Sequence, residues 1–142
     1  MAILGFTASA FDMLHAGHIS MLEEAASLCD TLICGLHVDP STERVEKSKP
    51  VQPLSERYIQ LSAIRFVGKI IPYQNEEELL QLIALVRPNI RFLGEEYRDK
   101  AFTGRELCES LGVHIHYNSR RHGLSSTLQR ARLAHAHPDH RT

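Results

Sequence analysis

The sequence has little of what marks disulfide-rich or membrane-spanning proteins. Its 142 residues include three cysteines and no tryptophan. Three irregularly spaced cysteines exclude a disulfide framework, and we expect Cys29, Cys34 and Cys108 to be buried thiols in a reducing compartment. No apolar run approaches the roughly 18 residues of a membrane span, and no basic region precedes the apolar start "MAILGF". We therefore expect a cytoplasmic protein without a membrane anchor.

An excess of charge of either sign is also lacking. The formal net charge is −1 at pH 7, which gives no overall attraction to nucleic acid or membrane. No basic stripe with interleaved aromatic residues appears, so a nucleic-acid-binding role is disfavoured. The 43% of hydrophobic and 23% of charged residues are typical of a globular protein and disfavour disorder. The length suits one domain that buries roughly 70% of its unfolded surface.

What the sequence does contain is an alternation of strand-like and helix-like segments. Short continuous apolar runs predict buried strands at "AILGFT", "TLICGLHV", "KIIPY", "NIRFLG" and "VHIHY". Between and after them, apolar spacing and capping residues predict helices over 18–29, 54–65, 75–86, 104–112 and about 125–134. This alternation predicts a Rossmann-like, doubly wound parallel α/β sheet in a single domain over 1–134, followed by a flexible His-rich tail at 135–142.

Two details of these helices are specific enough to test. The apolar face of the 54–65 helix is expected to carry Tyr58, Leu61 and Ile64. Asn75 is the expected N-cap of the next helix, whose first turn is acidic and so suits the helix dipole. The intervening segment 39–53 is long, polar and interrupted by prolines, as functional loops of α/β proteins often are.

The stretch "FDMLHAGHIS" places His15 and His18 between the first strand and the first helix. Ligands of open α/β sheets bind at this position, and a helix N-terminus attracts anions. Gly17 removes a side chain and lets an anion approach the backbone. Two readings compete with phosphate binding: a metal site, for which further ligands are missing, and an ordinary helix start with His15 as cap and His18 on the surface.

A second segment, "SRRHGLSSTLQ", has the composition of another anion site at a helix start. Ser125, Ser126 and Thr127 are typical N-cap and first-turn residues, and Arg120 and Arg121 offer forked hydrogen bonds to phosphate. A capped helix with solvated arginines is the alternative. Two such segments in one small α/β chain favour a phosphate-rich ligand.

Together these segments resemble a known family. "HAGH" matches the H-x-G-H signature of the nucleotidyltransferase superfamily, and "RRHGLSST" resembles its second signature. Over about residues 3 to 134 the chain is similar to single-domain cytidylyltransferases typified by glycerol-3-phosphate cytidylyltransferase. The segments "SERYIQLSAIRFVGKIIP" and "FLGEEY" also resemble that family. The resemblance implies the nucleotidyltransferase type of Rossmann-like fold, Mg²⁺ bound with the nucleotide, and a homodimer.

The resemblance also implies an activity and a set of site residues. The family transfers a nucleoside monophosphate from CTP or ATP to an acceptor, releases pyrophosphate, and relies on positioning and electrostatics. Its motifs map onto this sequence as follows: His15 and His18 at the triphosphate, Lys47 near the reacting centre, Lys49 near the acceptor phosphate, Arg120 with Ser125, Ser126 and Thr127 at the β- and γ-phosphates, Ala10, Phe11, Gly17, Arg65 and Glu95 at the nucleotide, and Asp12 near the metal. The alternative for Asp12 is a structural role, hydrogen bonding of its own turn. The alternative for Lys47 and Lys49 is that they lie in a solvated basic loop.

The sequence departs from the family at four positions. Ser9 and Ala10 stand where the family usually has glycine and threonine. After Arg120, Arg121 and His122 stand where the family usually has threonine and glutamate. The acceptor therefore cannot be assumed to be glycerol 3-phosphate. Cytidylyl transfer from CTP to a small phosphorylated alcohol is the first expectation. Adenylyl transfer from ATP and a catalytically silent nucleotide-binding protein are the alternatives.

Overall fold

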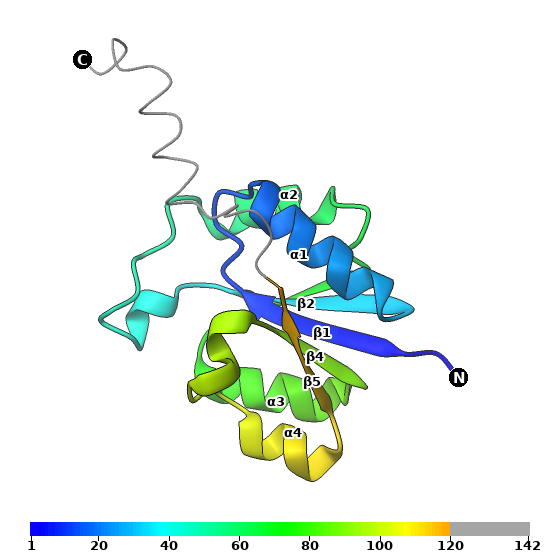
Figure 1. Cartoon of the computed structure of the whole chain (residues 1–142). Coiled ribbons are helices and arrows are strands. Elements are labelled where there is room, and N and C mark those ends of the chain that lie inside the picture. Colours follow the sequence, from blue (N-terminus) through cyan, green and yellow to red (C-terminus); the bar gives the residue numbers. More distant parts are fainter. Residues whose placement is uncertain (120–142) are drawn as a thin grey trace, which may run out of the picture.

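The computed structural model describes residues 1–119, and in them a parallel sheet forms the centre of the fold (Figure 1). Its five strands are β1 (Leu4–Ser9), β2 (Thr31–His37), β3 (Lys69–Tyr73), β4 (Ile90–Gly94) and β5 (His114–Asn118). They lie in the order β3-β2-β1-β4-β5. The chain therefore builds outward from β1 in one direction and then returns to build on the other side, which confirms the predicted doubly wound sheet.

Helices cover both faces of this sheet (Figure 1). The helices α1 (Ala16–Ser27) and α2 (Leu54–Ser62) lie on one face, and α3 (Glu76–Val86) and α4 (Arg105–Leu111) lie on the other. Two short 3₁₀ helices, η1 (Pro40–Thr42) and η2 (Glu95–Asp99), follow β2 and β4 at their carboxyl ends. In the described part of the chain, no helix is long and apolar enough to cross a membrane.

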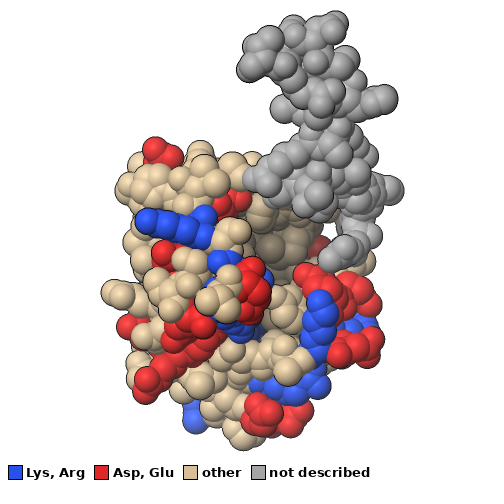
Figure 2. All heavy atoms as spheres, turned by 90° about the vertical axis from the view of Figure 1, so that its left-hand side faces the viewer, with Lys and Arg blue, Asp and Glu red and all other residues tan. Residues whose placement is uncertain are grey.

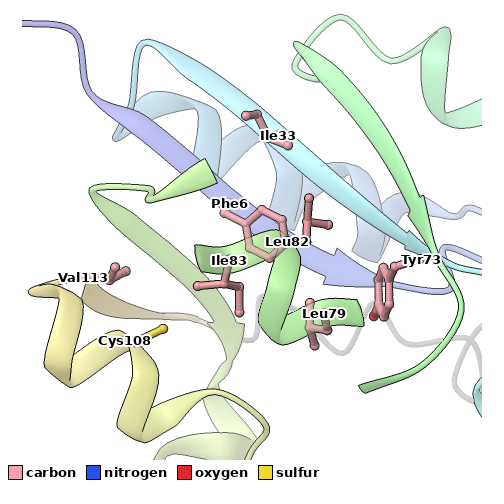
Figure 3. Close-up of a cluster of buried hydrophobic side chains, with 8 residues drawn as sticks. All are labelled: Phe6, Ile33, Tyr73, Leu79, Leu82, Ile83, Cys108 and Val113. Carbon is pink, nitrogen blue, oxygen red and sulfur yellow. The ribbon is translucent and has the colours of Figure 1, made fainter. Parts of the chain in front are cut away.

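Each face of the sheet has its own hydrophobic core, because alternate residues of a strand point to opposite faces. Phe6 of β1 and Ile33 of β2 pack with α3 and α4 residues such as Ile83 and Cys108 (Figure 3). The other core contains Leu22 and Ala25 of α1, Cys34 and Leu36 of β2, and Phe92 of β4. The three cysteines are free thiols, and Cys34 and Cys108 are fully buried, as expected, whereas Cys29 is only partly buried.

The helix boundaries confirm some details of the sequence pattern and correct others. Asn75 caps α3 by accepting a hydrogen bond from the Glu78 N–H at 2.8 Å, as predicted. The first helix starts at Ala16 rather than His18, because His15 acts as its N-cap. The prediction that Tyr58 lies on the buried face of α2 is wrong. Its side chain is 43% exposed, and the neighbouring Arg57 is buried instead. The predicted helix near 125–134 and the tail 135–142 lie outside the described residues.

Candidate active site

A cleft of about 500 Å³ opens at the carboxyl ends of the strands. Because the chain reverses its direction of building at β1, the ends of β1 and β4 leave a crevice between their outgoing loops. All five strands contribute lining residues, including Ser9, His37, Tyr73, Gly94 and Asn118. Figure 2 views this end of the molecule and shows a hollow bordered by both basic and acidic side chains. Electrostatics alone therefore do not restrict the cleft to a simple anion.

His15 and His18 stand together at the start of α1, with ring centroids 4.2 Å apart. Nδ1 of His15 accepts a hydrogen bond from the Gly17 N–H at 2.9 Å. Nδ1 of His18 accepts one from the His15 N–H at 3.2 Å. The pair thus forms a reciprocal capping arrangement in which imidazoles replace the usual hydroxyl and carboxylate groups. The helix-cap alternative for His15 is therefore part of the structure, and the predicted contact with the triphosphate stays a prediction.

These backbone hydrogen bonds determine which ring nitrogen carries the proton. A neutral imidazole that accepts at Nδ1 must carry its hydrogen on Nε2. Burial lowers the pKa of His18 to about 4, helped by the neighbouring His15 and opposed by Asp12. Burial also lowers the pKa of His15. Both rings are therefore neutral at pH 7 and keep an Nε2–H group that the cap does not use, which suits donation to phosphate oxygens.

The loop between β1 and α1 is strained and held from outside. Phe11 and Met13 both have a φ of 48°, an uncommon conformation for residues other than glycine. The carboxylate of Asp12 accepts hydrogen bonds from the Val51 and Gln52 N–H groups at 2.8 and 3.0 Å. Asp12 therefore has a structural contact, but with the distant 51–52 backbone rather than with its own turn, which the structural alternative predicts. Ala10 lines the cleft, whereas the Phe11 side chain is fully buried in the core.

Sequence reasoning missed Arg57, which connects three segments around the cleft. Its guanidinium is 2% exposed and donates to four carbonyl oxygens, those of Ala10, His37, Val38 and Gln52, at 2.6 to 3.0 Å. No carboxylate among the described residues forms an ion pair with it, and burial lowers its pKa despite the opposing effect of Asp12 and Asp39. Its position in the apolar stripe of α2 was the only available signal, and a charged residue there is normally assigned to solvent.

The structure separates the other predicted site residues. Lys47 lines the cleft, but Lys49 does not. The pKa of Asp39 is lowered mainly by its hydrogen bond from Ser41 and to a smaller extent by Lys49. Arg65 is exposed beyond the end of α2 and stacks on Phe66, 4.9 Å from its ring centroid. Glu95 forms an exposed ion pair with Arg98 at 2.9 Å.

The neighbouring carboxylate lies closer to the cleft than Glu95 does. Glu96 is among the lining residues, and a Cβ added at Gly94 would lie only 2.5 Å from its Oε2 atom. The carboxylate of Glu96 therefore folds over the end of β4. The sequence alone does not decide whether Glu95 or the adjacent Glu96 faces the nucleotide. The position of the carboxylate favours Glu96 at the cleft.

Three buried polar atoms at the cleft have no partner among the described residues. They are Nε2 of His37, Nε of Arg91 and Oδ1 of Asn118. Their residues are 6%, 3% and 4% exposed, respectively. Since nearly all buried polar groups in proteins are hydrogen-bonded, these three mark positions where a ligand can supply the partner. None of them was predicted, because all lie within or at the end of apolar strand segments.

The described residues contain no group of three or more side chains suited to hold a metal ion. Asp12, the predicted metal contact, already uses both oxygens to accept backbone hydrogen bonds. Arg120, Ser125, Ser126 and Thr127, predicted for the β- and γ-phosphates, lie outside the described residues. The last described residue is anchored at α1: Glu24 accepts hydrogen bonds from the Ser119 hydroxyl at 3.0 Å and its N–H at 3.3 Å.

Comparison with known proteins places this geometry in a family. A family model described as cytidylyltransferase-like matches residues 6–132. The chain is 38% identical to the bifunctional protein HldE of Photorhabdus laumondii over 122 residues, which is 85% of this chain and 26% of the relative. It is 33% identical to HldE of Acidiphilium cryptum over 131 residues, 92% of this chain and 27% of the relative. The chain thus spans about a quarter of the length of these curated relatives.

Solved structures show the same fold. A lipopolysaccharide core biosynthesis protein from Thermoplasma volcanium superposes with a TM-score of 0.67 at 26% identity, covering 85% of this chain and 98% of that chain. A pantoate-beta-alanine ligase from Francisella tularensis superposes with a TM-score of 0.64 at 19% identity, covering 91% of this chain and 65% of that chain. With the family model spanning most of its length, the chain belongs to the cytidylyltransferase-like family and is an enzyme of the nucleotidyltransferase type.

Proposed function

We propose that the protein transfers AMP from ATP to a phosphorylated, sugar-like acceptor and releases pyrophosphate. The relatives that cover most of the chain are HldE proteins, which favour the ATP-dependent branch over the cytidylyl transfer first expected from the sequence. The similarity to a lipopolysaccharide core biosynthesis protein favours an acceptor of saccharide type. CTP with a small phosphorylated alcohol becomes the second candidate, carried by the family resemblance of the two signatures.

The observation that carries the proposal is the pair of neutral histidines at the start of α1, whose Nε2–H groups take no part in the helix cap. An acceptor phosphate oxygen attacks the α-phosphorus in line, a new P–O bond forms, and the bond to the pyrophosphate oxygen breaks. Negative charge shifts toward the oxygens of the α-phosphate and of the leaving group during this step. The Nε2–H groups of His15 and His18 donate hydrogen bonds to those oxygens without passing on a proton.

The remaining residues would position the substrates. Lys47, at the cleft, supplies positive charge near the reacting phosphates, and Glu96, over the end of β4, is placed to accept hydrogen bonds from the nucleoside. Mg²⁺ would neutralise charge on the triphosphate, and its ligands would come mainly from the phosphates, because the described residues form no metal site. The homodimer stays a prediction.

The test is pyrophosphate release by the purified chain with Mg²⁺, either ATP or CTP, and a panel of acceptors. The panel contains hexose and heptose 1-phosphates together with glycerol 3-phosphate. Release that requires ATP and one sugar phosphate supports the proposal. Release only with CTP restores the second candidate. Thermal stabilisation by nucleotide with no release for any acceptor would favour a binding protein without turnover.

His18→Ala provides the residue-level control. Loss of a donor that acts in the transition state is expected to lower turnover by a factor on the order of 10² or more. His114→Ala, at an exposed position on β5, is the matched control and should leave turnover unchanged. Full activity of a folded His18→Ala variant would contradict the proposed role of the histidine pair.

A further inference from the structure

The end of the cleft next to β2 and β3 contains a second cluster of polar and charged side chains, to which the proposed transfer assigns no role. We call it the His37 end, and it consists of His37, Tyr73, Glu76, Arg44 and Arg91, all of which line the cleft. Tyr73 connects the cluster electrostatically: burial raises its pKa, Glu76 acts in the same direction, and Arg91 and Arg44 oppose them. The five side chains therefore form one polar group at one end of the cleft.

His37 presents an unused hydrogen-bond acceptor there. Its ring stacks on Tyr73 with centroids 4.5 Å apart and an interplanar angle of 25°. Burial lowers the pKa of His37. A backbone hydrogen bond with Gln74 opposes this effect, as expected when a carbonyl oxygen accepts from the ring N–H. Nε2 has no partner among residues 1–119, so we assign the Gln74 contact to Nδ1. In the neutral ring, Nε2 then carries the lone pair.

Arg91 presents an unused donor at the same end. Its guanidinium is almost entirely buried, donates from one terminal nitrogen to the Thr103 carbonyl oxygen, and lies 5.3 Å from the Phe102 ring centroid. Its Nε–H has no partner among the described residues. Leaving a buried donor or acceptor unpaired costs free energy, and a ligand that pairs both groups recovers it on binding.

The chemistry of this end selects among ligands. The Arg44 to Glu76 ion pair, at 3.2 Å, and the Arg44 hydrogen bond to the Thr103 hydroxyl, at 3.5 Å, join the 39–53 loop to α3 and to the 94–104 segment. A neutral acceptor nitrogen, a carboxylate and a guanidinium donor suit hydroxyl groups, which donate and accept. A phosphate has no hydrogen to offer His37 and would meet the Glu76 carboxylate.

We propose that the His37 end binds the hydroxyl-bearing body of the acceptor, with His37 Nε2 accepting from one hydroxyl and Arg91 Nε–H donating to an adjacent oxygen. The inference rests on the proposed function and refines it: the substrate is a polyhydroxylated phosphate, and His37 and Arg91 are specificity-determining residues. The phosphate of the same acceptor would then extend toward Lys47 and the reacting centre.

The experiment combines two variants with deoxygenated substrates. His37→Phe keeps an aromatic ring on Tyr73 and removes both nitrogens, whereas His37→Asn keeps a group near Nδ1 for Gln74 and removes only the Nε2 position. Binding of hexose or heptose 1-phosphates, and of analogues that lack single hydroxyls, is measured by calorimetry with a non-hydrolysable ATP analogue present. The kcat and KM values for ATP and for the acceptor are measured in parallel.

Both variants are expected to weaken acceptor binding on the order of 10-fold and to leave the KM for ATP within about 2-fold. The unmodified protein should bind one of the deoxy analogues more weakly than the complete sugar phosphate by a similar factor. The variants should bind this analogue and the complete sugar phosphate equally well. That result without pyrophosphate release would support the subsite while contradicting the proposed transfer. Equal binding of every deoxy analogue by the unmodified protein, or no binding of any sugar phosphate, overturns the inference. So does a folded variant of unchanged acceptor affinity.

Discussion

Two histidine environments, one at the start of α1 and one at the end of β2 where His37 lines the cleft, use the same side chain in opposite ways. At the start of α1, backbone N–H groups bind Nδ1 of His15 and His18 and leave each ring with an Nε2–H donor. At the end of β2, the backbone of Gln74 hydrogen-bonds to the His37 ring and leaves Nε2 as an acceptor. All three rings are kept neutral, because burial lowers the pKa of each. The backbone partner, rather than the residue type, decides whether a histidine donates or accepts.

The difference follows from where each ring sits on the fold. A helix N-terminus has free N–H groups, so a histidine there is bound at its acceptor nitrogen. The end of a parallel strand presents carbonyl oxygens to the next loop, so a histidine there is bound at its donor nitrogen. Donors on one side suit phosphate, and an acceptor on the other suits a hydroxyl. Three predictions test or sharpen this contrast.

The largest effect is expected at Arg57, which donates to the carbonyl oxygens of Ala10 and His37 and so joins the two environments. Arg57→Met leaves four buried carbonyl oxygens without that donor, and the free energy of unfolding should fall by about 3 kcal/mol or more. Urea unfolding measures this change. Arg65→Met, at an exposed position shortly after α2, is the control and should change stability by less than about 0.5 kcal/mol. Equal stability of the two variants would show that Arg57 does not join the segments.

A smaller effect is expected when His15 is reduced to its capping role. Asparagine is a preferred N-cap and can accept from the Gly17 N–H, but it lacks the Nε2–H group. His15→Asn should therefore keep the melting temperature within a few degrees and lower kcat between about 10-fold and 100-fold. Pyrophosphate release and thermal unfolding are measured on the same preparation. Full turnover in this variant would reduce His15 to a cap alone.

The smallest effect concerns pH. The pKa of His18 falls from 6.5 to about 4 on folding, so the unfolded chain binds more protons between these values. Stability from this group is present above pH 6.5 and is lost as the pH falls toward 4. His18→Asn can still accept from the His15 N–H but does not titrate. Between pH 7 and 5 the unmodified protein should lose about 1 kcal/mol more than this variant in urea unfolding. An identical pH dependence would show that His18 is not held neutral by the fold.

Much of the architecture was predictable because it depends on local patterns. Apolar runs and helical spacing identified the strands and helices within the described residues, and Asn75 was recognised as a cap from its side-chain chemistry. The histidine pair was found by its spacing and its place after the first strand. Tyr58 was misplaced because helical spacing does not show that a neighbouring arginine has buried carbonyl oxygens to bind.

The amino-acid sequence by itself determined the order of strands and helices, the doubly wound class of fold and the position of His15 and His18 at the start of the helix that follows β1. These features follow from side-chain periodicity and capping, which act over a few residues. Only the tertiary structure decided that Arg57 joins the loops, that Glu96 rather than Glu95 lines the cleft, and that Nε2 of His37 and Nε of Arg91 are buried there without a partner among residues 1–119. Burial and unpaired hydrogen-bonding groups depend on segments far apart in the chain, so they exist only once the sheet has formed.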